Sequence, residues 1–377
     1  MGAPRRARVE RVVSVLGDRL DRRIRSEGPL SLSQFMAVAL HDAEAGYYTR
    51  RQPIGLAGDY VTAPEISQIF GELIGLWCAE LWAQMGRPAP VRLAELGPGR
   101  GVMAEDLLRA AAAVPGFRRA LRLCLLEASP LLRAEQARRL GEVGPRWVAS
   151  IDELPPGPLL VVANEFLDAL PIRQLTRGPR GWSERLVGLD AEGRRVFVGG
   201  PESDAAGLFV PEPLRHTAAP GTIIEICPSA LALAAALAAR FACEPGAALF
   251  IDYGYGEERA GPTLRAFRRH GAVSALDEPG EADLSAAVDF AAFAEAARAA
   301  GAAVAGPVTQ REFLLALGIE ARLAALAARA SPAQRTQLET GIRRLLDPGE
   351  MGTRFKALAI SSPGLAPDGF AGAGEAR

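Results

Sequence analysis

The stretch Val91-Arg-Leu-Ala-Glu-Leu-Gly-Pro-Gly-Arg-Gly101 decides the fold of this chain. An apolar run that ends among glycines, followed by the helical pattern of Val102–Ala113, predicts a strand that turns sharply into a helix. Because glycine has no Cβ, Gly97, Gly99 and Gly101 allow the backbone to turn back and a ligand to lie close to the main chain. The helix also presents unpaired N–H groups at its first turn. The stretch therefore predicts a ligand-binding turn.

Short apolar segments alternate with helical ones after this turn. Further strands are predicted at Leu121–Glu127, Trp147–Ala149, Leu159–Ala163, Ala247–Asp252, Ala303–Val308 and Phe355–Ile360. Further helices are predicted at Pro130–Leu140, Ser229–Phe241, Leu284–Ala300, Gln310–Ala330 and Pro332–Leu346. Such alternation is typical of βαβ units, so we expect an α/β fold with a Rossmann-like, mostly parallel sheet.

The segments outside this alternation predict three additions. Residues 1–90 carry helical periodicity in Val9–Ile24, Leu32–Leu40 and Ile66–Met85, and we expect them to form an N-terminal cap or lid. Residues 91–362 would form the Rossmann-like domain, with a β-rich insertion at about 172–226. Antiparallel strands are expected there at Arg173–Thr176, Trp182–Leu189, Arg195–Val198 and Thr222–Ile226. Residues 363–377 are expected to form a frayed tail.

Composition excludes several classes of function. The chain has 377 residues, a formal net charge of −1 and a pI near 6.4, so neither nucleic acid nor an anionic membrane surface is an expected partner. We also expect no membrane insertion, since no apolar run reaches the length of a span. The four cysteines and three histidines are scattered, so we predict neither a metal site nor disulfides. A reducing compartment is expected, either bacterial cytoplasm or, in a eukaryote, the mitochondrial matrix.

The spacing of the turn favours one cofactor over another. Its pattern is G-x-G-x-G rather than the G-x-G-x-x-G of dinucleotide sites, and Glu95 precedes the first glycine by two residues. A pyrophosphate would be repelled by this carboxylate, whereas the sulfonium and ammonium of S-adenosylmethionine would be attracted to it. We therefore predict that Glu95, Gly97, Pro98, Gly99 and Gly101 bind S-adenosylmethionine.

Two further acids follow the next strands. Glu127 ends the second strand, where a carboxylate can accept hydrogen bonds from both ribose hydroxyls; an exposed loop acid is the alternative. Asp152 follows the third strand and could contact the adenine, or could equally cap a turn.

Polar residues also follow the fourth strand. Asn164 and Glu165 come directly after an apolar run and would face the methyl donor, with Asp168 close behind. The alternative is a helix capped by Asn164 with Asp168 in its first turn.

Upstream, Thr62 or Pro64 would begin a helix with Glu65 in its first turn, beside the cationic end of the donor. An ordinary capped helix explains these residues equally well.

The chain resembles a known family, the MidA-like methyltransferases, which was formerly a family of unknown function. The resemblance is carried by Gly28–Ser31, Gly46–Tyr48, Gly58–Glu72, Glu95–Gly101, Ala163–Pro171, Glu225–Pro228, Asp252–Gly254, Asp283–Asp289 and Met351–Phe355. The family pattern has Ser where Ala63 stands and usually Thr where Ser285 stands. These departures affect neither the expected fold nor the expected cofactor.

The resemblance implies a class I methyltransferase fold and, because the mitochondrial member is an arginine methyltransferase that assists assembly of respiratory complex I, a protein acceptor such as a complex I subunit. A homodimer is a further expectation. Since a guanidinium stays charged near neutral pH and prefers a carboxylate, an arginine methyltransferase needs acids beside the sulfonium. Glu165 is the first candidate, with Asp168 or Glu225 as a second acid.

Two other functions stay open at this stage. A nicotinamide-dependent oxidoreductase shares the strand, turn and ribose acid. A non-catalytic assembly chaperone could retain the methyltransferase fold without its chemistry.

Overall fold

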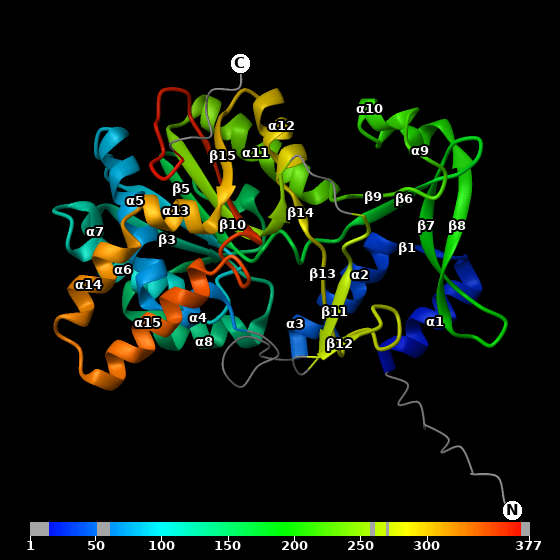
Figure 1. Ribbon diagram of the computed structural model, residues 1–377, viewed down its shortest axis with the longest axis horizontal. Coiled ribbons are helices and arrows are strands. Elements are labelled where there is room, and N and C mark those ends of the chain that lie inside the picture. Colours follow the sequence, from blue (N-terminus) through cyan, green and yellow to red (C-terminus); the bar gives the residue numbers. More distant parts are fainter. Residues whose placement is uncertain (1–14, 51–60, 257–260, 269–270, 371–377) are drawn as a thin grey trace, which may run out of the picture.

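A mostly parallel sheet organises the chain, as predicted. The computed structural model describes residues 15–50, 61–256, 261–268 and 271–370 (Figure 1). The central sheet has eight strands. In spatial order these are β15 (Ala303–Thr309), β16 (Phe355–Ser361), β10 (Gly246–Tyr255), β5 (Leu159–Asn164), β2 (Val91–Leu96), β3 (Leu121–Leu126) and β4 (Arg146–Val148), with β14 (Val288–Asp289) beside the end of β10. Neighbouring strands run parallel, except that β16 is antiparallel to both β10 and β15.

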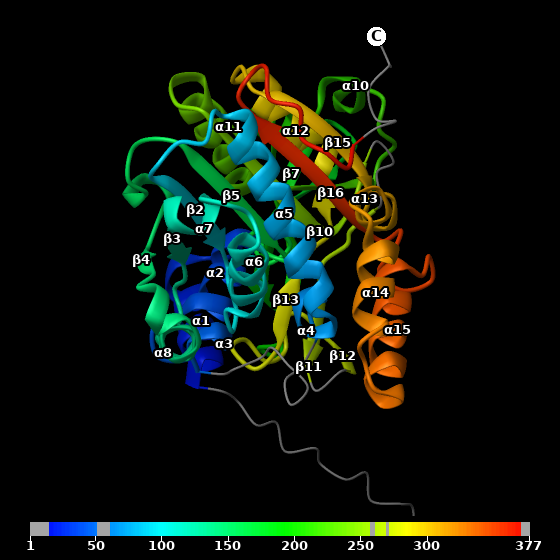
Figure 2. The ribbon, with the colours of Figure 1, turned by 90° about the vertical axis from the view of Figure 1, so that its left-hand side faces the viewer.

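Side chains alternate across this sheet and are buried on both faces. In β5, Leu160 and Val162 pack on one face, whereas Leu159, Val161 and Ala163 pack on the other. The first face is covered by α5 (Gln68–Gln84) and α6 (Val102–Ala112), which cross in front of the sheet in Figure 2. The second face is covered by α11 (Pro228–Cys243) and α12 (Phe290–Ala299). Burial on both faces explains why these strands appear as continuous apolar runs in the sequence.

A second sheet forms the other side of the molecule, seen on the right in Figure 1. It consists of β1 (Leu30–Ser31), β6 (Arg173–Arg177), β7 (Trp182–Leu189), β8 (Arg195–Ser203) and β9 (Ile223–Ile226), with α9 (Asp204–Leu208) and α10 (Glu212–Arg215) between β8 and β9. All its pairings are antiparallel in the described chain, as expected for the inserted ribbon. The helices α1 (Val15–Glu27) and α2 (Leu32–His41) share a hydrophobic cluster with this sheet.

The remaining elements complete both parts. They are α3 (Tyr47–Arg50), α4 (Ala63–Ile66), α7 (Phe117–Ala120), α8 (Pro130–Leu140), the 3₁₀ turns η1 (Gly141–Val143) and η2 (Ile151–Glu153), α13 (Gln310–Ala316), α14 (Ile319–Ala327), α15 (Pro332–Leu346), and a small sheet of β11 (Arg265–Arg268), β12 (Gly271–Val273) and β13 (Asp283–Ser285). None of the described helices is long and apolar enough to cross a membrane.

Three of the predicted helices are wrong in extent. The segment 284–289 forms β13 and β14 instead of helix, because Asp289 caps the N–H of Ala292 at 2.9 Å and α12 begins only at Phe290. The predicted helix Gln310–Ala330 is two helices, since Gly318 adopts φ +82° between α13 and α14. The predicted helix Ile66–Met85 also divides, with Ser67 capping α5.

The described part of the predicted tail differs from expectation, whereas residues 371–377 lie outside the described residues. Residues 363–370 pack onto the core instead of fraying: Phe370 is buried against Phe313, and the indole of Trp77 donates to the carbonyl of Asp368 at 3.1 Å. The beginning of the predicted helix Val9–Ile24 lies outside the described residues. The limits proposed for the domains, residues 90 and 362, stay a prediction. Within the expected N-terminal cap, α1 and α5 belong to different hydrophobic clusters.

Candidate active site

The turn between β2 and α6 has the backbone that its glycines predicted. Gly97, Gly99 and Gly101 have φ of +65°, +52° and +78°, in the left-handed region that other residues avoid. A Cβ on Gly97 would stand 2.8 Å from the ring of Phe166, so space as well as φ requires glycine there. The turn is closed by a hydrogen bond from the Gly101 N–H to the Pro98 carbonyl at 2.8 Å.

A small cavity of about 40 Å³, which we call the cofactor pocket, lies over this turn. Three segments far apart in the sequence line it: the start of α4, the turn itself, and the end of β5. The predicted residues that it brings together are Thr62, Pro64, Glu65, Glu95, Gly97, Pro98, Gly99, Asn164 and Glu165. Arg100, Val102 and Met103 complete the lining and were not predicted.

Two acceptor oxygens in this pocket have no partner in the described chain. They are Oε2 of Glu95 and Oδ1 of Asn164, both buried. A buried acceptor without a donor is costly, so the site is suited to a ligand that brings N–H groups and positive charge. The ammonium and sulfonium of S-adenosylmethionine have these properties. The residues present therefore fit this cofactor.

Burial also changes the protonation of Glu95. Removal of its carboxyl from water, and secondarily the charge of Glu127, raise its pKa to about 8. In the free protein the neutral acid is therefore favoured at pH 7, and a bound cation would favour the carboxylate.

Glu127 lies directly after β3 and is held in place by neighbours. Its carboxylate accepts from the Ser129 N–H at 2.8 Å and from Nε2 of Gln136 at 3.1 Å. The same Nε2 donates to the Gly99 carbonyl at 2.7 Å, so Gln136 connects Glu127 to the glycine turn. Glu127 is buried and is not an exposed loop acid, and burial raises its pKa. Its contact with a ribose stays a prediction.

Gln136 was missed from the sequence, although a signal was present. It stands at helical spacing between Leu132 and Leu140 on the buried face of α8, where a polar residue needs a partner. Trp147 supplies a second one, with its indole N–H 2.8 Å from Oε1 of Gln136.

Three predicted cofactor residues, Glu127, Gly101 and Asp152, do not line the cofactor pocket. Gly101 caps the start of α6, and Asp152 lies in η2 after β4. The adenine contact of Asp152 stays a prediction. Glu65 is in the first turn of α4, as predicted, and its carboxylate accepts from Arg100 at 3.3 Å, which partly neutralises its charge.

The turn after β5 is held by hydrogen bonds to Asp252, which was not predicted as a site residue. Oδ2 of Asp252, on β10, accepts from the N–H groups of Phe166, Leu167 and Asp168 at 3.0, 2.8 and 3.3 Å. No helix follows β5, so the alternative in which Asn164 caps a helix is wrong. The sequence signal was Asp252 at the end of a strongly apolar strand, a place where a carboxylate must find donors.

Glu165 occupies a strained position in this turn. Its φ is +51°, and its Oε1 accepts from the Ala63 N–H at 2.9 Å and from Nδ2 of Asn164 at 3.1 Å. Loss of hydration raises its pKa to about 7, although these hydrogen bonds oppose the shift and the charge of Asp168 supports it. A side chain with this pKa changes charge near neutral pH, which suits a proton acceptor. Its catalytic role stays a prediction.

Asp168 and Glu225 are not in the cofactor pocket. Burial, and then the charges of Asp252 and Asp283, raise the pKa of Asp168 well above its usual range. Glu225 lies on β9, where its carboxylate accepts from Gln174 at 2.7 Å and from the Thr263 N–H at 2.9 Å. Of the predicted acids, the structure therefore joins Glu165 to the cofactor residues and separates Glu225 from them.

Comparison with known proteins agrees with this geometry. Residues 73–308 match a family described as "Putative S-adenosyl-L-methionine-dependent methyltransferase". The chain is 38% identical over 371 residues to Protein arginine methyltransferase NDUFAF7, mitochondrial, of Xenopus tropicalis, covering 90% of this chain and 84% of the relative. The Homo sapiens protein of that name is 33% identical over 370 residues, covering 90% and 81%.

A solved structure from Burkholderia thailandensis is also similar. It holds S-adenosyl-homocysteine, is 30% identical in sequence, and superposes with a TM-score of 0.80 over 95% of both chains. A second structure from that organism gives a TM-score of 0.79 at 32% identity, over 95% of this chain and 94% of the other.

Proposed function

The chain belongs to this family of S-adenosyl-L-methionine-dependent methyltransferases, with the class I fold and S-adenosylmethionine as cofactor, and on that premise we propose that it methylates an arginine side chain of a protein. The names of the relatives support the choice of arginine. The observation that carries the proposal is Glu165, an acid with a pKa of about 7 in the wall of the cofactor pocket.

The chemistry requires an acid at this place. When bound, S-adenosylmethionine supplies an electrophilic methyl group: the acceptor nitrogen forms a bond to the methyl carbon, and the electron pair of the broken carbon–sulfur bond stays on sulfur. The guanidinium must lose one proton in exchange. As a carboxylate, Glu165 can orient the guanidinium by hydrogen bonds and take that proton.

The two other functions have less support. In a nicotinamide enzyme the helix after the glycine turn holds a pyrophosphate, and the unpartnered oxygen of Glu95 would face that negative charge. An assembly chaperone without catalysis would not need a carboxyl of raised pKa in the cofactor pocket.

We extend the proposal to partners and location. The acceptor is a protein, and a subunit of respiratory complex I is the first to test. The relatives are named as mitochondrial proteins, and their names do not support the expected cytoplasmic location. We propose the mitochondrial matrix for a eukaryotic source and the cytoplasm for a bacterial one. A homodimer stays a prediction.

The experiment is mass spectrometry of complex I subunits from cells with and without the gene. We expect one arginine to lose its methyl groups in the deletion strain and to regain them when the wild-type gene is restored. Restoration of the methylation by a Glu165→Gln gene would contradict the proposed role of Glu165 as the proton acceptor. If arginine methylation of these subunits were the same in both strains, complex I would be excluded as the source of the acceptor.

A further inference from the structure

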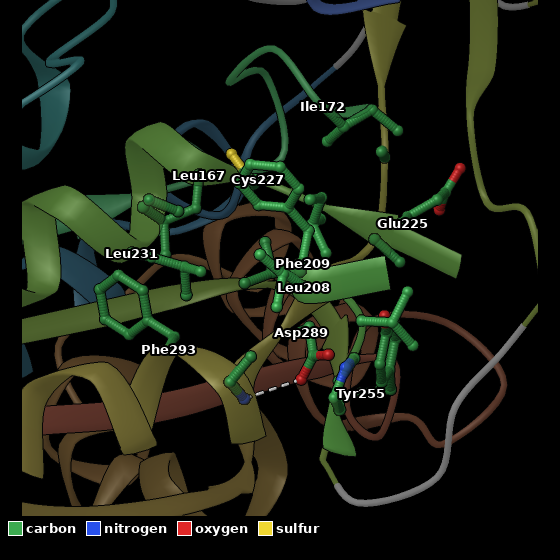
Figure 3. Close-up of a pocket in the computed structure, with 18 of the residues that line it drawn as sticks. Leu167, Ile172, Leu208, Phe209, Glu225, Cys227, Leu231, Tyr255, Asp289 and Phe293 are labelled. Carbon is green, nitrogen blue, oxygen red and sulfur yellow. Dashed lines mark hydrogen bonds between the residues drawn. The ribbon is translucent and has the colours of Figure 1, made fainter. Parts of the chain in front are cut away.

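A second and larger cavity opens at the same edge of the central sheet. Its volume is about 300 Å³, at the small end for ligand sites, and we call it the apolar pocket. It lies between the end of β10 and α12 on one side and the α9–α10 segment of the inserted sheet on the other (Figure 3). Its apolar lining includes Leu167, Ile172, Phe209, Ile226, Val288 and Phe293.

The mouth of this pocket exposes two large apolar side chains. Leu208 is 70% and Phe209 49% accessible to solvent. Adjacent exposed apolar residues at the edge of a cavity are typical of a binding surface rather than of chance exposure. In Figure 3 the labelled side chains of Leu208 and Phe209 stand among the other lining residues.

The backbone that carries these two residues is held in place. Arg215 donates from its guanidinium to the carbonyls of Gly207 at 3.0 Å and Val210 at 3.1 Å, one on each side of the pair. The indole of Trp182 in turn donates to the Arg215 carbonyl at 2.9 Å. The exposed pair is therefore presented by a braced loop.

The ring of Phe209 has its own support. The guanidinium carbon of Arg173 lies 4.6 Å from the ring centroid, within the range of a cation–π contact. Arg173 is held by Glu184 through two hydrogen bonds, of 2.8 and 2.6 Å. A ring that is fixed before binding loses little conformational freedom when a ligand arrives.

The apolar pocket adjoins the cofactor pocket through one turn. Leu167 lines the first and Glu165 lines the second, so their Cα atoms are at most about 7 Å apart. Oδ2 of Asp252 holds the N–H of Leu167 and of both its neighbours. An extended chain with its arginine at Glu165 would reach the apolar pocket within a few residues.

We propose that the apolar pocket binds a large aliphatic or aromatic side chain of the acceptor protein, within about four residues of the methylated arginine. The inference rests on the proposed function and adds a substrate requirement to it. Three acids, Glu212, Glu225 and Asp289, line the pocket with one cation, Arg215, and this excess of negative charge favours a basic segment over an acidic one. Asp289 keeps one oxygen on the Ala292 N–H, the dashed line in Figure 3.

The test uses short fluorescein-labelled peptides, each with one arginine among glycines. One series carries a single leucine placed one to four residues before or after the arginine, and the reference peptide carries none. Fluorescence polarisation is measured on the full chain saturated with S-adenosylhomocysteine. We expect leucine at the preferred place to tighten binding about tenfold, the gain from burying one such side chain.

Variants then locate the effect. Phe209→Ala and Leu208→Ala should each remove most of the leucine-dependent gain. Leu76→Ala is the matched control, because Leu76 is 43% exposed on α5, outside the lining of both pockets, and this variant should retain the gain. Calorimetry with S-adenosylhomocysteine shows that each variant is folded, since its affinity should not change.

The outcomes separate this inference from the proposed function. Equal binding of all peptides, or a leucine effect that survives both pocket substitutions, would overturn the inference. If the chain self-associates and Phe209→Ala abolishes that self-association, a second copy of the chain covers the mouth of the apolar pocket. This result would also overturn the inference. Leucine-dependent binding without arginine methylation of any peptide would keep the pocket and contradict the proposed function.

Discussion

The two pockets lie at one edge of one sheet, yet they differ in almost every property. The cofactor pocket measures about 40 Å³ and contains two buried oxygens without partners in the described chain. The apolar pocket measures about 300 Å³ and is lined by aliphatic and aromatic side chains. The first is built from two turns at the ends of β2 and β5 and from the start of α4, and the second forms where the inserted sheet approaches the core. If both proposals hold, chemistry and substrate choice belong to different parts of the chain.

The sharpest test of this division is Glu165→Gln, which keeps the size of the side chain and removes its charge. We expect kcat to fall by about 10² to 10⁴, the usual contribution of a general base, with donor affinity retained. Single-turnover methylation at saturating S-adenosylmethionine measures this.

The matched variant is Glu225→Gln, because Glu225 lines the apolar pocket. It should weaken acceptor binding more than it slows the methyl-transfer step. If Glu165→Gln transferred methyl groups at full speed and Glu225→Gln did not, the assignment of the two pockets would be reversed.

The next test is Gly99→Val, which places a branched side chain at φ +52° where the donor approaches the backbone. We expect donor affinity to fall about a hundredfold or more, corresponding to roughly 3 kcal/mol. Isothermal titration calorimetry with S-adenosylmethionine measures it.

Gly144→Val is its control, because Gly144 has φ +66° and a Cβ added there would meet no described atom within 4 Å. Both variants carry the strain of a left-handed valine, about 1–2 kcal/mol. Only Gly99→Val should lose the donor, and equal loss in both would point to general destabilisation.

Glu127→Ala should have a smaller effect. Removal of the carboxylate would cost the predicted hydrogen bonds to the ribose and free Gln136, so donor affinity should fall at least about tenfold. The affinity of the leucine-containing peptides for the apolar pocket should equal that of the wild-type protein. A change in acceptor affinity alone would show that Glu127 belongs to the acceptor site and not to the donor site.

The smallest effect concerns pH and tests the charge in the cofactor pocket. The pKa of Glu95 is raised to about 8 in the free protein, and a bound cation lowers it, so binding releases a proton below pH 8. Donor affinity should therefore fall as the pH falls below 8, by up to about tenfold per unit. Titrations between about pH 6.5 and 8.5 measure this slope. Glu95→Gln should abolish it, and a slope that persists in this variant would assign the proton to another group.

How far the sequence predicted this molecule depends on how local each feature is. The strand, turn and helix around Gly97–Gly101 were predictable because the conformation depends on adjacent residues that lack a Cβ. The strands β2, β5 and β10 were predictable because both of their faces are buried. Leu284–Val288 was predicted as helix, since its apolar residues fit helical spacing, but pairing of β13 with β11 and of β14 with β10 prevails there.

The predicted residues that line the cofactor pocket end strands or begin a helix, as Thr62, Pro64 and Glu65 do at the start of α4. Glu95, Asn164 and Glu165 could be placed together because parallel strands end at one edge. The contact of Gln136 with Gly99 joins residues 37 positions apart, and that of Asp252 with Leu167 joins residues 85 apart, so no local pattern reveals either. The mouth of the apolar pocket depends on how the inserted sheet packs, which periodicity within its strands does not specify.

The single oxygen of Asp252 that holds the turn from Phe166 to Asp168 has a thermodynamic consequence. Because Glu165 and Leu167 belong to that turn, we expect a displacement at either residue to move the other, which would link binding of the donor to binding of the proposed acceptor side chain. Linkage is reciprocal: the factor by which the acceptor side chain changes donor affinity equals the factor by which the donor changes acceptor affinity. An enzyme arranged in this way can hold its two substrates cooperatively and release both products once the methyl group has moved.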